Sequence, residues 1–177
     1  MCSSRGSSRR LSLPVLCALA ALVIGACGSE GTKDLATLEG DGFSVSMPGK
    51  PKRSEQSFPT ARGAVKAISY TSDSRDRAFS IGYTELPKGV EGDLRGTIAG
   101  SATKVGGTAR DEVDTTYQGF KARDARITGA ADNKGTLFLR AILVKNRLYV
   151  LQFIGNGANL KKPSAAYSQI INSLKIG

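Results

Sequence analysis

Apolar and polar residues alternate along several short segments of the chain, with the period of two that is typical of a half-buried β-strand. The alternation predicts strands over residues 43–47, 64–71, 78–83 and 121–128. The first of these segments ends at Pro48 and Gly49, which is typical of a turn. In the third, Phe79, Ile81 and Tyr83 would share one face, so this strand is expected to lie over a core.

The two most hydrophobic segments after the N-terminal region are 136–144 and 148–154. The short connection between them contains Asn146, and two apolar runs joined in this way predict a β-hairpin of central strands. The segment 121–128 differs, because polar residues fall on both of its faces. We therefore expect it to be an exposed or edge strand.

Two further segments have the spacing of helices. Between residues 91 and 105, apolar residues recur every three or four positions, and Gly106 and Gly107 follow. Pro163 opens a second such segment, whose apolar stripe is Ala166, Tyr167, Ile170, Ile171 and Leu174. An antiparallel sheet of about six to seven strands with two packed helices belongs to the α+β class.

The first 26 residues have the pattern of an export signal. Three arginines precede an apolar stretch over 11–24, and the small residues Gly25 and Ala26 follow it. This stretch is shorter than the roughly 20 residues that a membrane-spanning helix needs. We expect cleavage between Ala26 and Cys27, with an uncleaved anchor or a cut elsewhere by an ordinary signal peptidase as alternatives.

The four residues Ile24, Gly25, Ala26 and Cys27 resemble the lipobox of bacterial lipoproteins. The resemblance implies a diacylglyceryl group on the sulfur of Cys27, with acylation of the new amino terminus as a further option. It implies a protein that is held on the extracytoplasmic side of a cell membrane or an outer membrane. Arg9 and Arg10 leave both the general secretory and the twin-arginine export routes open.

After the leader, residues 27–42 are polar with four glycines and predict a flexible tether behind the lipidated cysteine. Residues 43–177 are expected to form a single α+β domain. Cys2 and Cys17 lie within the leader, so Cys27 would be the one cysteine of the mature chain and a disulfide is not expected. The basic cluster at 50–53 is expected to be a solvated loop, with contact to lipid headgroups as the alternative.

The charge and the residue composition limit the kinds of catalytic and metal-binding sites that the chain can form. The net charge is +10, which falls to +7 without the three leader arginines (22 basic against 15 acidic residues). Histidine is absent, which removes the commonest general base and the commonest metal ligand. Asp111, Glu112 and Asp114 could serve a hard cation, but the segment lacks the alternating ligands and the glycine of a calcium loop. We predict no catalytic, cofactor-binding or metal-binding residue, and no nucleic-acid partner.

The order of the segments, from 42–48 (GFSVSMP) through 79–83 and 147–150 to 173–176, resembles the PsbP-like fold of small bacterial lipoproteins. The resemblance implies a binding or accessory role. The sequence thus predicts a monomeric, non-enzymatic envelope lipoprotein whose partner, besides the membrane, is an envelope protein or an apolar ligand. The alternatives are a carrier of an apolar small molecule or lipid, held between sheet and helix, and an uncharacterised hydrolase. A lined cavity would favour the carrier, and a packed core with an exposed apolar patch would favour a protein partner.

Overall fold

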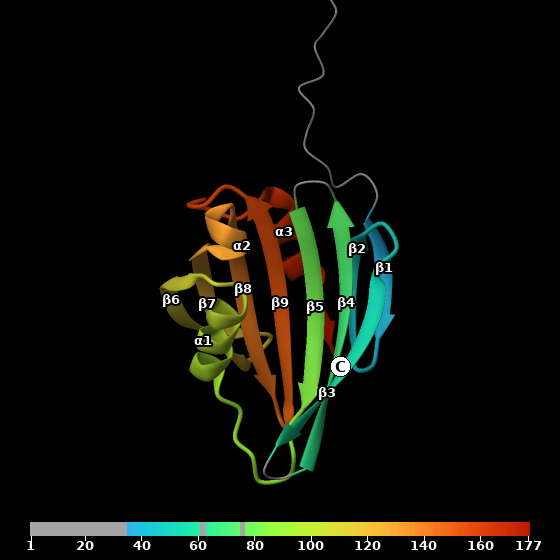
Figure 1. Cartoon of the computed structure of the whole chain (residues 1–177). Helices are drawn as coiled ribbons and strands as arrows, with labels where there is room; N and C mark the ends of the chain where they lie inside the picture. Colours follow the sequence, from blue (N-terminus) through green and yellow to red (C-terminus); the bar gives the residue numbers. More distant parts are fainter. Residues whose placement is uncertain (1–34, 61–62, 75–76) are drawn as a thin grey trace, which may run out of the picture.

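The computed structural model describes residues 35–60, 63–74 and 77–177, which form two antiparallel β-sheets and three helices (Figure 1). The strands are β1 (Leu35–Gly40), β2 (Phe43–Pro48), β3 (Lys52–Thr60), β4 (Gly63–Ser74), β5 (Arg77–Glu85), β6 (Thr108–Tyr117), β7 (Phe120–Gly129), β8 (Gly135–Val144), β9 (Arg147–Asn156) and β10 (Lys175–Ile176). The helices are α1 (Leu94–Lys104), the single turn α2 (Ala130–Asn133) and α3 (Ala165–Ser173). None of these helices is long and apolar enough to cross a lipid bilayer.

The larger sheet has seven strands in the order β3-β4-β5-β9-β8-β7-β6, and every neighbouring pair is antiparallel. The β8–β9 hairpin lies in the interior of this sheet, which confirms the prediction of central strands over 136–144 and 148–154. The smaller sheet has the order β1-β2-β10. The predicted α+β class, with an antiparallel sheet and two packed helices, is therefore confirmed.

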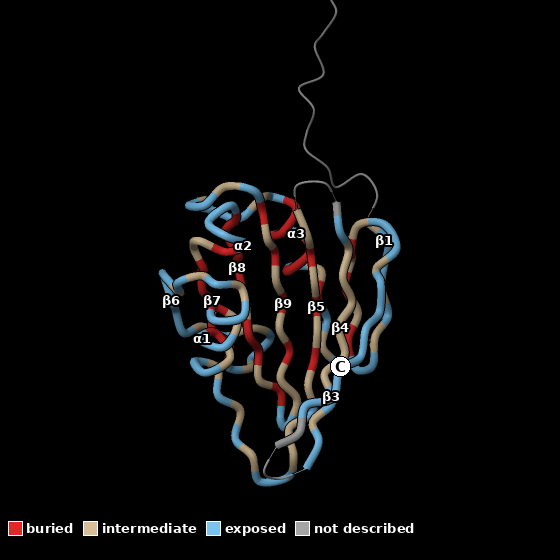
Figure 2. The backbone as a smooth tube through the Cα atoms, viewed as in Figure 1, coloured by how far each residue is buried: buried red, intermediate tan, exposed pale blue. Residues whose placement is uncertain are grey.

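The two faces of the seven-stranded sheet are covered unequally. On one face, the smaller sheet and α3 pack over a large core that includes Phe43, Ile81, Leu151 and Ile170. On the other face, α1 covers a second core over β7 and β8, built around Ile98 and Ile127. Figure 1 shows α1 in front of β7 and β8, while β9, β5 and β4 have no helix in front of them. Figure 2 shows buried residues along β5, β9, β8 and β7 and in α3.

Both predicted long helices form, and each begins at a side-chain cap. Asp93 accepts a hydrogen bond from the backbone N–H of Gly96, which satisfies one of the unpaired donors at the start of α1. Ser164 does the same for the N–H of Tyr167 in α3. The buried positions of α1 are Ile98 and Ala102, four residues apart, so the helix lays one face on the sheet.

The predicted tether over 27–42 is wrong in its second half. Residues 35–40 form β1, which pairs with β2 along six residues, from Leu35 opposite Pro48 to Gly40 opposite Phe43. The ring of Phe43 lies where a side chain at position 40 would stand, so a glycine is needed there. The folded unit thus includes Leu35, and the first half of the expected tether lies outside the described residues.

The basic cluster at 50–53 is a loop only in part. Lys52 and Arg53 begin β3, which was not predicted, and Arg53 forms an ion pair with Glu55 at 2.9 Å. These side chains are exposed, as expected for a solvated segment. β3 was not predicted because an edge strand with an exposed face needs few apolar residues. Phe58 is the one large apolar residue of β3.

The prediction that 121–128 is an exposed or edge strand is wrong. β7 lies between β6 and β8, and its two arginines, Arg123 and Arg126, are buried. The acidic residues of β6 neutralise them: Arg123 pairs with Glu112 and Asp114, and Arg126 pairs with Asp111. A buried charge is tolerated when it is paired and hydrogen-bonded, so polar residues on both faces do not require an edge position.

Candidate functional site

A groove of about 490 Å3 lies on the less covered face of the seven-stranded sheet. Ser101 and Lys104 of α1, and Val105 at the C-terminal cap of this helix, line one side of it. The remaining lining residues are Gln56 and Phe58 of β3, Ala67, Ile68, Ser69 and Thr71 of β4, Ala78, Ser80, Gly82, Tyr83 and Thr84 of β5, Leu137 of β8, and Val150, Gln152 and Ile154 of β9. We call this surface the open-face groove.

The groove follows from the alternation of large and small residues along β5. The large residues Phe79, Ile81 and Tyr83 point into the core below α3 and the smaller sheet. The residues between them are small and face the groove: Ala78, Ser80, Gly82 and Thr84. A Cβ at Gly82 would lie 3.1 Å from the carbonyl oxygen of Ile68 on β4, so a larger residue would crowd β4 at this position. Because Gly82 has no side chain, the floor of the groove is low at this point.

The open-face groove is almost uncharged. Although 23% of the chain is charged, Lys104 is the one charged residue among the described residues that line the groove. Phe58 is 48% exposed at the β3 side, and Val150 and Ile154 add apolar surface from β9. A contiguous surface with apolar residues and few charges is typical of the centre of a protein interface or of a ligand site.

The hydroxyl groups on the floor largely bond with one another. The Thr71 hydroxyl donates to Ser80 Oγ across β4 and β5 at 3.3 Å, and Ser54 and Ser69 form a similar pair at 3.0 Å across β3 and β4. Because these polar groups already have partners in the described structure, covering them with an apolar surface leaves few hydrogen bonds unmade.

A second cavity, of about 370 Å3, lies on the other face between α3 and strands β7 and β8. Its polar walls include a paired guanidinium and carboxylate: Arg140 donates from Nε and Nη2 to both carboxylate oxygens of Asp124, each at 2.6 Å. These hydrogen bonds raise the pKa of the Arg140 guanidinium. The buried hydroxyl of Tyr167 has no hydrogen-bond partner among the described residues, and burial raises the pKa of this group.

The structure does not reach the residues that the sequence singled out for lipid attachment. Ala26 and Cys27 lie outside the described residues. Asp111, Glu112 and Asp114 lie on β6 as ion-pair partners of buried arginines, so their carboxylates already have counter-ions. Among residues 35–60, 63–74 and 77–177, no group of three or more acidic, cysteine or histidine side chains is placed to hold a metal ion.

Sequence reasoning missed the floor of the open-face groove. The alternation over 78–83 identified the side that faces the core, and the hydrophobicity of 148–154 indicated a central strand, but the opposite face of these strands was given no role. The signal that was available is composition: the outward positions of 78–84 are small, and none of them is charged.

The fold has a solved counterpart. The chain is similar to the solution structure of cyanobacterial PsbP (CyanoP) from Synechocystis sp. PCC 6803, with a TM-score of 0.58 and 13% sequence identity. The alignment covers 87% of this chain and 99% of that protein. The domain has the PsbP-like fold. At this identity the similarity extends to the fold alone, and neither a protein-family model nor a curated relative matches the sequence.

Proposed function

We propose that the protein is a lipid-anchored, non-enzymatic accessory protein of the bacterial envelope, and that it binds a protein partner in the open-face groove. The observation that carries the binding part is the uncharged, small-residue face of β5 and its neighbours beside α1. Its shortage of charged side chains matches the centre of a protein interface, from which charged residues are depleted.

The shape of the groove favours a protein partner over a carried small molecule. The cavity of about 370 Å3 between α3 and the sheet has the paired Arg140 and Asp124 in its wall, whereas the apolar surface of the groove lies on an open sheet face with α1 along one side. A partner with protruding side chains could reach this floor, because Ala78, Ser80 and Gly82 leave room above it. The second candidate, a carrier of an apolar molecule, is supported by the cavity of about 370 Å3 between α3 and the sheet and by the groove volume of about 490 Å3, both within the range of small-molecule sites.

The anchoring part of the proposal rests on the lipobox resemblance at Cys27. β1 begins at Leu35, eight residues after Cys27 (35 − 27). Eight residues span at most about 29 Å when fully extended. A diacylglyceryl group on Cys27 would therefore hold the domain close to the bilayer, where it would meet membrane proteins. Two or more acyl chains would give stable attachment.

The non-enzymatic part of the proposal rests on residue usage. The chain has no histidine, and the open-face groove has no acidic residue among its described lining. A hydrolase would need a nucleophile with an adjacent base. Ser101 and Lys104 lie three residues apart on α1 at the groove, but the Ser101 hydroxyl donates its proton to the Thr97 carbonyl at 2.8 Å. The Ser101 and Lys104 spacing is the one feature of the described groove lining that favours the hydrolase alternative, and this hydrogen bond opposes it.

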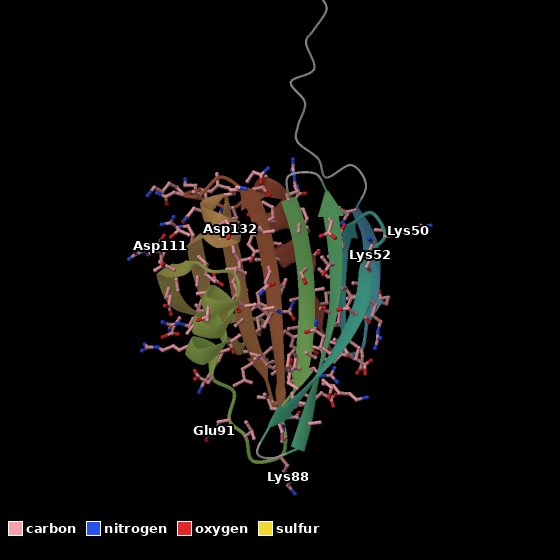
Figure 3. The ribbon with its side chains drawn as sticks, viewed as in Figure 1. Lys50, Lys52, Lys88, Glu91, Asp111 and Asp132 are labelled. Carbon is pink, nitrogen blue, oxygen red and sulfur yellow. The ribbon has the colours of Figure 1, made fainter. Side chains whose placement is uncertain are left out.

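Photocrosslinking in intact cells tests the proposal. The photoreactive residue p-benzoylphenylalanine would replace Phe58, a similar ring that lies on the groove, and Lys50, an exposed residue on the β2–β3 connection (Figure 3). We expect a discrete protein adduct from position 58, lost when Ser80→Glu places a charge on the floor and retained with Thr116→Glu on the exposed face of β6. Equal adducts from both positions, or an adduct that survives Ser80→Glu, would contradict the proposal. Lipid in place of protein would support the carrier.

A further inference from the structure

A third pocket lies away from the open-face groove, at the end of the molecule where α2 meets the β9–α3 loop. Its volume is about 450 Å3, and its lining combines the ends of β6 and β7 with Asn133 of α2 and with Asn159 and Lys161 of the loop. Unlike the open-face groove, it is polar. We call it the basic pocket.

The charges that line the basic pocket all have one sign. Arg110, Arg126 and Lys161 line the pocket, and none of its described lining residues is acidic; Asp111, which pairs with Arg126, offsets one of the three positive charges. The other polar side chains are hydroxyls and amides, such as Thr128, Asn133 and Asn159, which can donate hydrogen bonds. A concave surface with convergent cations raises the local concentration of anions.

Arg126 is held in place at this pocket. The residue is only 9% exposed, and its Nε donates to Asp111 Oδ2 at 2.6 Å. Its Nη1 donates to Asn159 Oδ1 at 2.7 Å, and more weakly to the Leu160 carbonyl at 3.3 Å. Nη2 has no acceptor among the described residues, so a fixed guanidinium keeps donors available to a ligand.

The two backbone segments that form the walls are bonded to each other. The N–H of Gly129 donates to the Ala158 carbonyl at 3.3 Å, and the N–H of Gly157 donates to the Lys134 carbonyl at 2.8 Å. Beneath them, the buried Thr136 hydroxyl donates to the Gly157 carbonyl and accepts from the N–H of Leu160. The pocket is therefore already shaped in the absence of a ligand, which lowers the entropic cost of binding.

The α2 turn places Asn133 at the pocket in an unusual backbone conformation. Ala131, Asp132 and Asn133 are three consecutive residues with positive φ angles of 51°, 57° and 65°. Non-glycine residues adopt this region at an energetic cost, and such strain is often found at functional sites. The strain supports the assignment, which stands on the charges and the bonded walls.

We infer that the basic pocket binds an oxyanion of the phosphate class. Its three basic side chains, one of them the fixed guanidinium of Arg126, and its amide donors match a compact, multiply charged group with several acceptor oxygens. Two sources share this chemistry: a free phosphate and the phosphate of an anionic lipid headgroup. The lipid source rests on the proposed anchoring; consistent with it, β1 begins at the same end of the molecule as α2 and the β9–α3 loop (Figure 1).

Phosphorus NMR on the full chain, purified in an uncharged detergent, tests the inference with two probes. One probe is inorganic phosphate, and the other is phosphatidylglycerol in mixed micelles. The test variant is the double substitution Arg110→Gln with Lys161→Gln, both exposed residues of the pocket. The matched control is Arg95→Gln with Lys88→Gln, which removes the same charge from exposed positions; Figure 3 shows Lys88 at the opposite end from Asp132.

We expect saturable broadening of at least one phosphorus signal. The affinity obtained from it should fall about tenfold or more in the pocket variant and less than twofold in the control. Broadening of inorganic phosphate indicates a free anion, and broadening of phosphatidylglycerol alone indicates a headgroup. The absence of saturable binding for both probes would overturn the inference. Equal weakening by the two double variants would also overturn it, because it would show attraction by overall charge. The outcome is independent of photocrosslinking in the groove, so either proposal can fail alone.

Discussion

The guanidinium carbon of Arg147 lies 4.6 Å from the centre of the Tyr83 ring. From this position on β9, the same guanidinium donates to the backbone carbonyl of Asp41 at 2.6 Å and to its carboxylate at 3.0 Å. Asp41 lies in the turn between β1 and β2, so this one side chain joins the smaller sheet to the seven-stranded sheet. Desolvation opposes the charge at Arg147, while the hydrogen bonds that the guanidinium donates to Tyr149 and Glu85 support it, and the pKa of the guanidinium is raised.

Replacing Arg147 should therefore loosen the contact between the sheets. We expect Arg147→Met to lower the free energy of unfolding by about 2 kcal/mol, because it removes charge-assisted hydrogen bonds and the contact with the Tyr83 ring. Urea unfolding followed by circular dichroism measures this change. The exposed Lys121 is the matched control, and Lys121→Met should change stability by less than about 0.5 kcal/mol. Equal effects of the two substitutions would show that Arg147 does not join the sheets.

Tyr167 and Tyr117 should respond in opposite directions to loss of the hydroxyl. The Tyr167 hydroxyl is buried without a partner among the described residues, so Tyr167→Phe should leave stability unchanged or raise it by up to about 1 kcal/mol. The Tyr117 hydroxyl bonds to the carbonyls of Ile171 (2.6 Å) and Leu174 (2.8 Å), so Tyr117→Phe should lower stability by about 1 kcal/mol. Thermal unfolding of the two variants checks both signs, and a destabilised Tyr167→Phe would reveal a missing partner.

Alkaline pH should destabilise the domain through its tyrosines. Burial is the main cause that raises the pKa of Tyr83, Tyr117 and Tyr167 in the folded state above the ordinary value of 10.0. Above about pH 10 the unfolded chain therefore binds fewer protons than the folded one, and stability falls as pH rises. The stability that depends on the protonated tyrosines is fully present below about pH 10. Tyrosinate absorbance and urea unfolding between pH 8 and about 11.5 should show it, and a flat stability profile would contradict it.

The side-chain cap at the start of α1 should contribute to the stability of the domain. Asp93→Ala should lower stability by about 1 kcal/mol, since the carboxylate no longer accepts from the N–H of Gly96 at 2.8 Å. Glu91→Ala is the matched control, because Glu91 is exposed and lies two residues before the cap. Chemical unfolding of both variants provides the comparison, and an equal loss in the two would mean that the cap is not responsible.

Local patterns predicted much of this fold because they report what each segment buries. The alternation of Phe79, Ile81 and Tyr83 identified the core face of β5, and the spacing of Ile98 and Ala102 identified the buried face of α1. The capping residues Asp93 and Ser164 explain why the helices begin where they do. These features depend on neighbours in sequence, which a single chain displays directly.

The features that were missed depend on distant pairing. β1 holds few apolar residues and looks like a polar linker until β2 and the smaller sheet provide its partners. The interior position of β7 depends on carboxylates of β6 that neutralise Arg123 and Arg126. The open-face groove arises because no helix or strand covers β4, β5 and β9 on this side. The sequence indicates such an uncovered face only through small, uncharged residues.

The anchoring prediction concerns a residue outside the described structure, and the leader offers its own control. If Cys27 is lipidated, Cys27→Ala should move the protein from the membrane to the soluble fraction and abolish labelling by a fatty-acid analogue. Cys17→Ala, within the same leader, should change neither result. Membrane association and labelling that persist in Cys27→Ala would disprove lipidation at this residue.

The central claim, that the open-face groove binds a partner, is tested most directly by quantitative co-purification from membranes. The full chain, Ser80→Glu on the floor of β5, and Thr116→Glu on β6 would each be extracted in mild detergent, and the recovered proteins and lipids compared by mass spectrometry. We predict one binding partner in a fixed ratio to the chain and to Thr116→Glu, reduced at least about tenfold with Ser80→Glu. Equal recovery of that partner with all three forms would show that it binds elsewhere and would contradict the assignment of the groove.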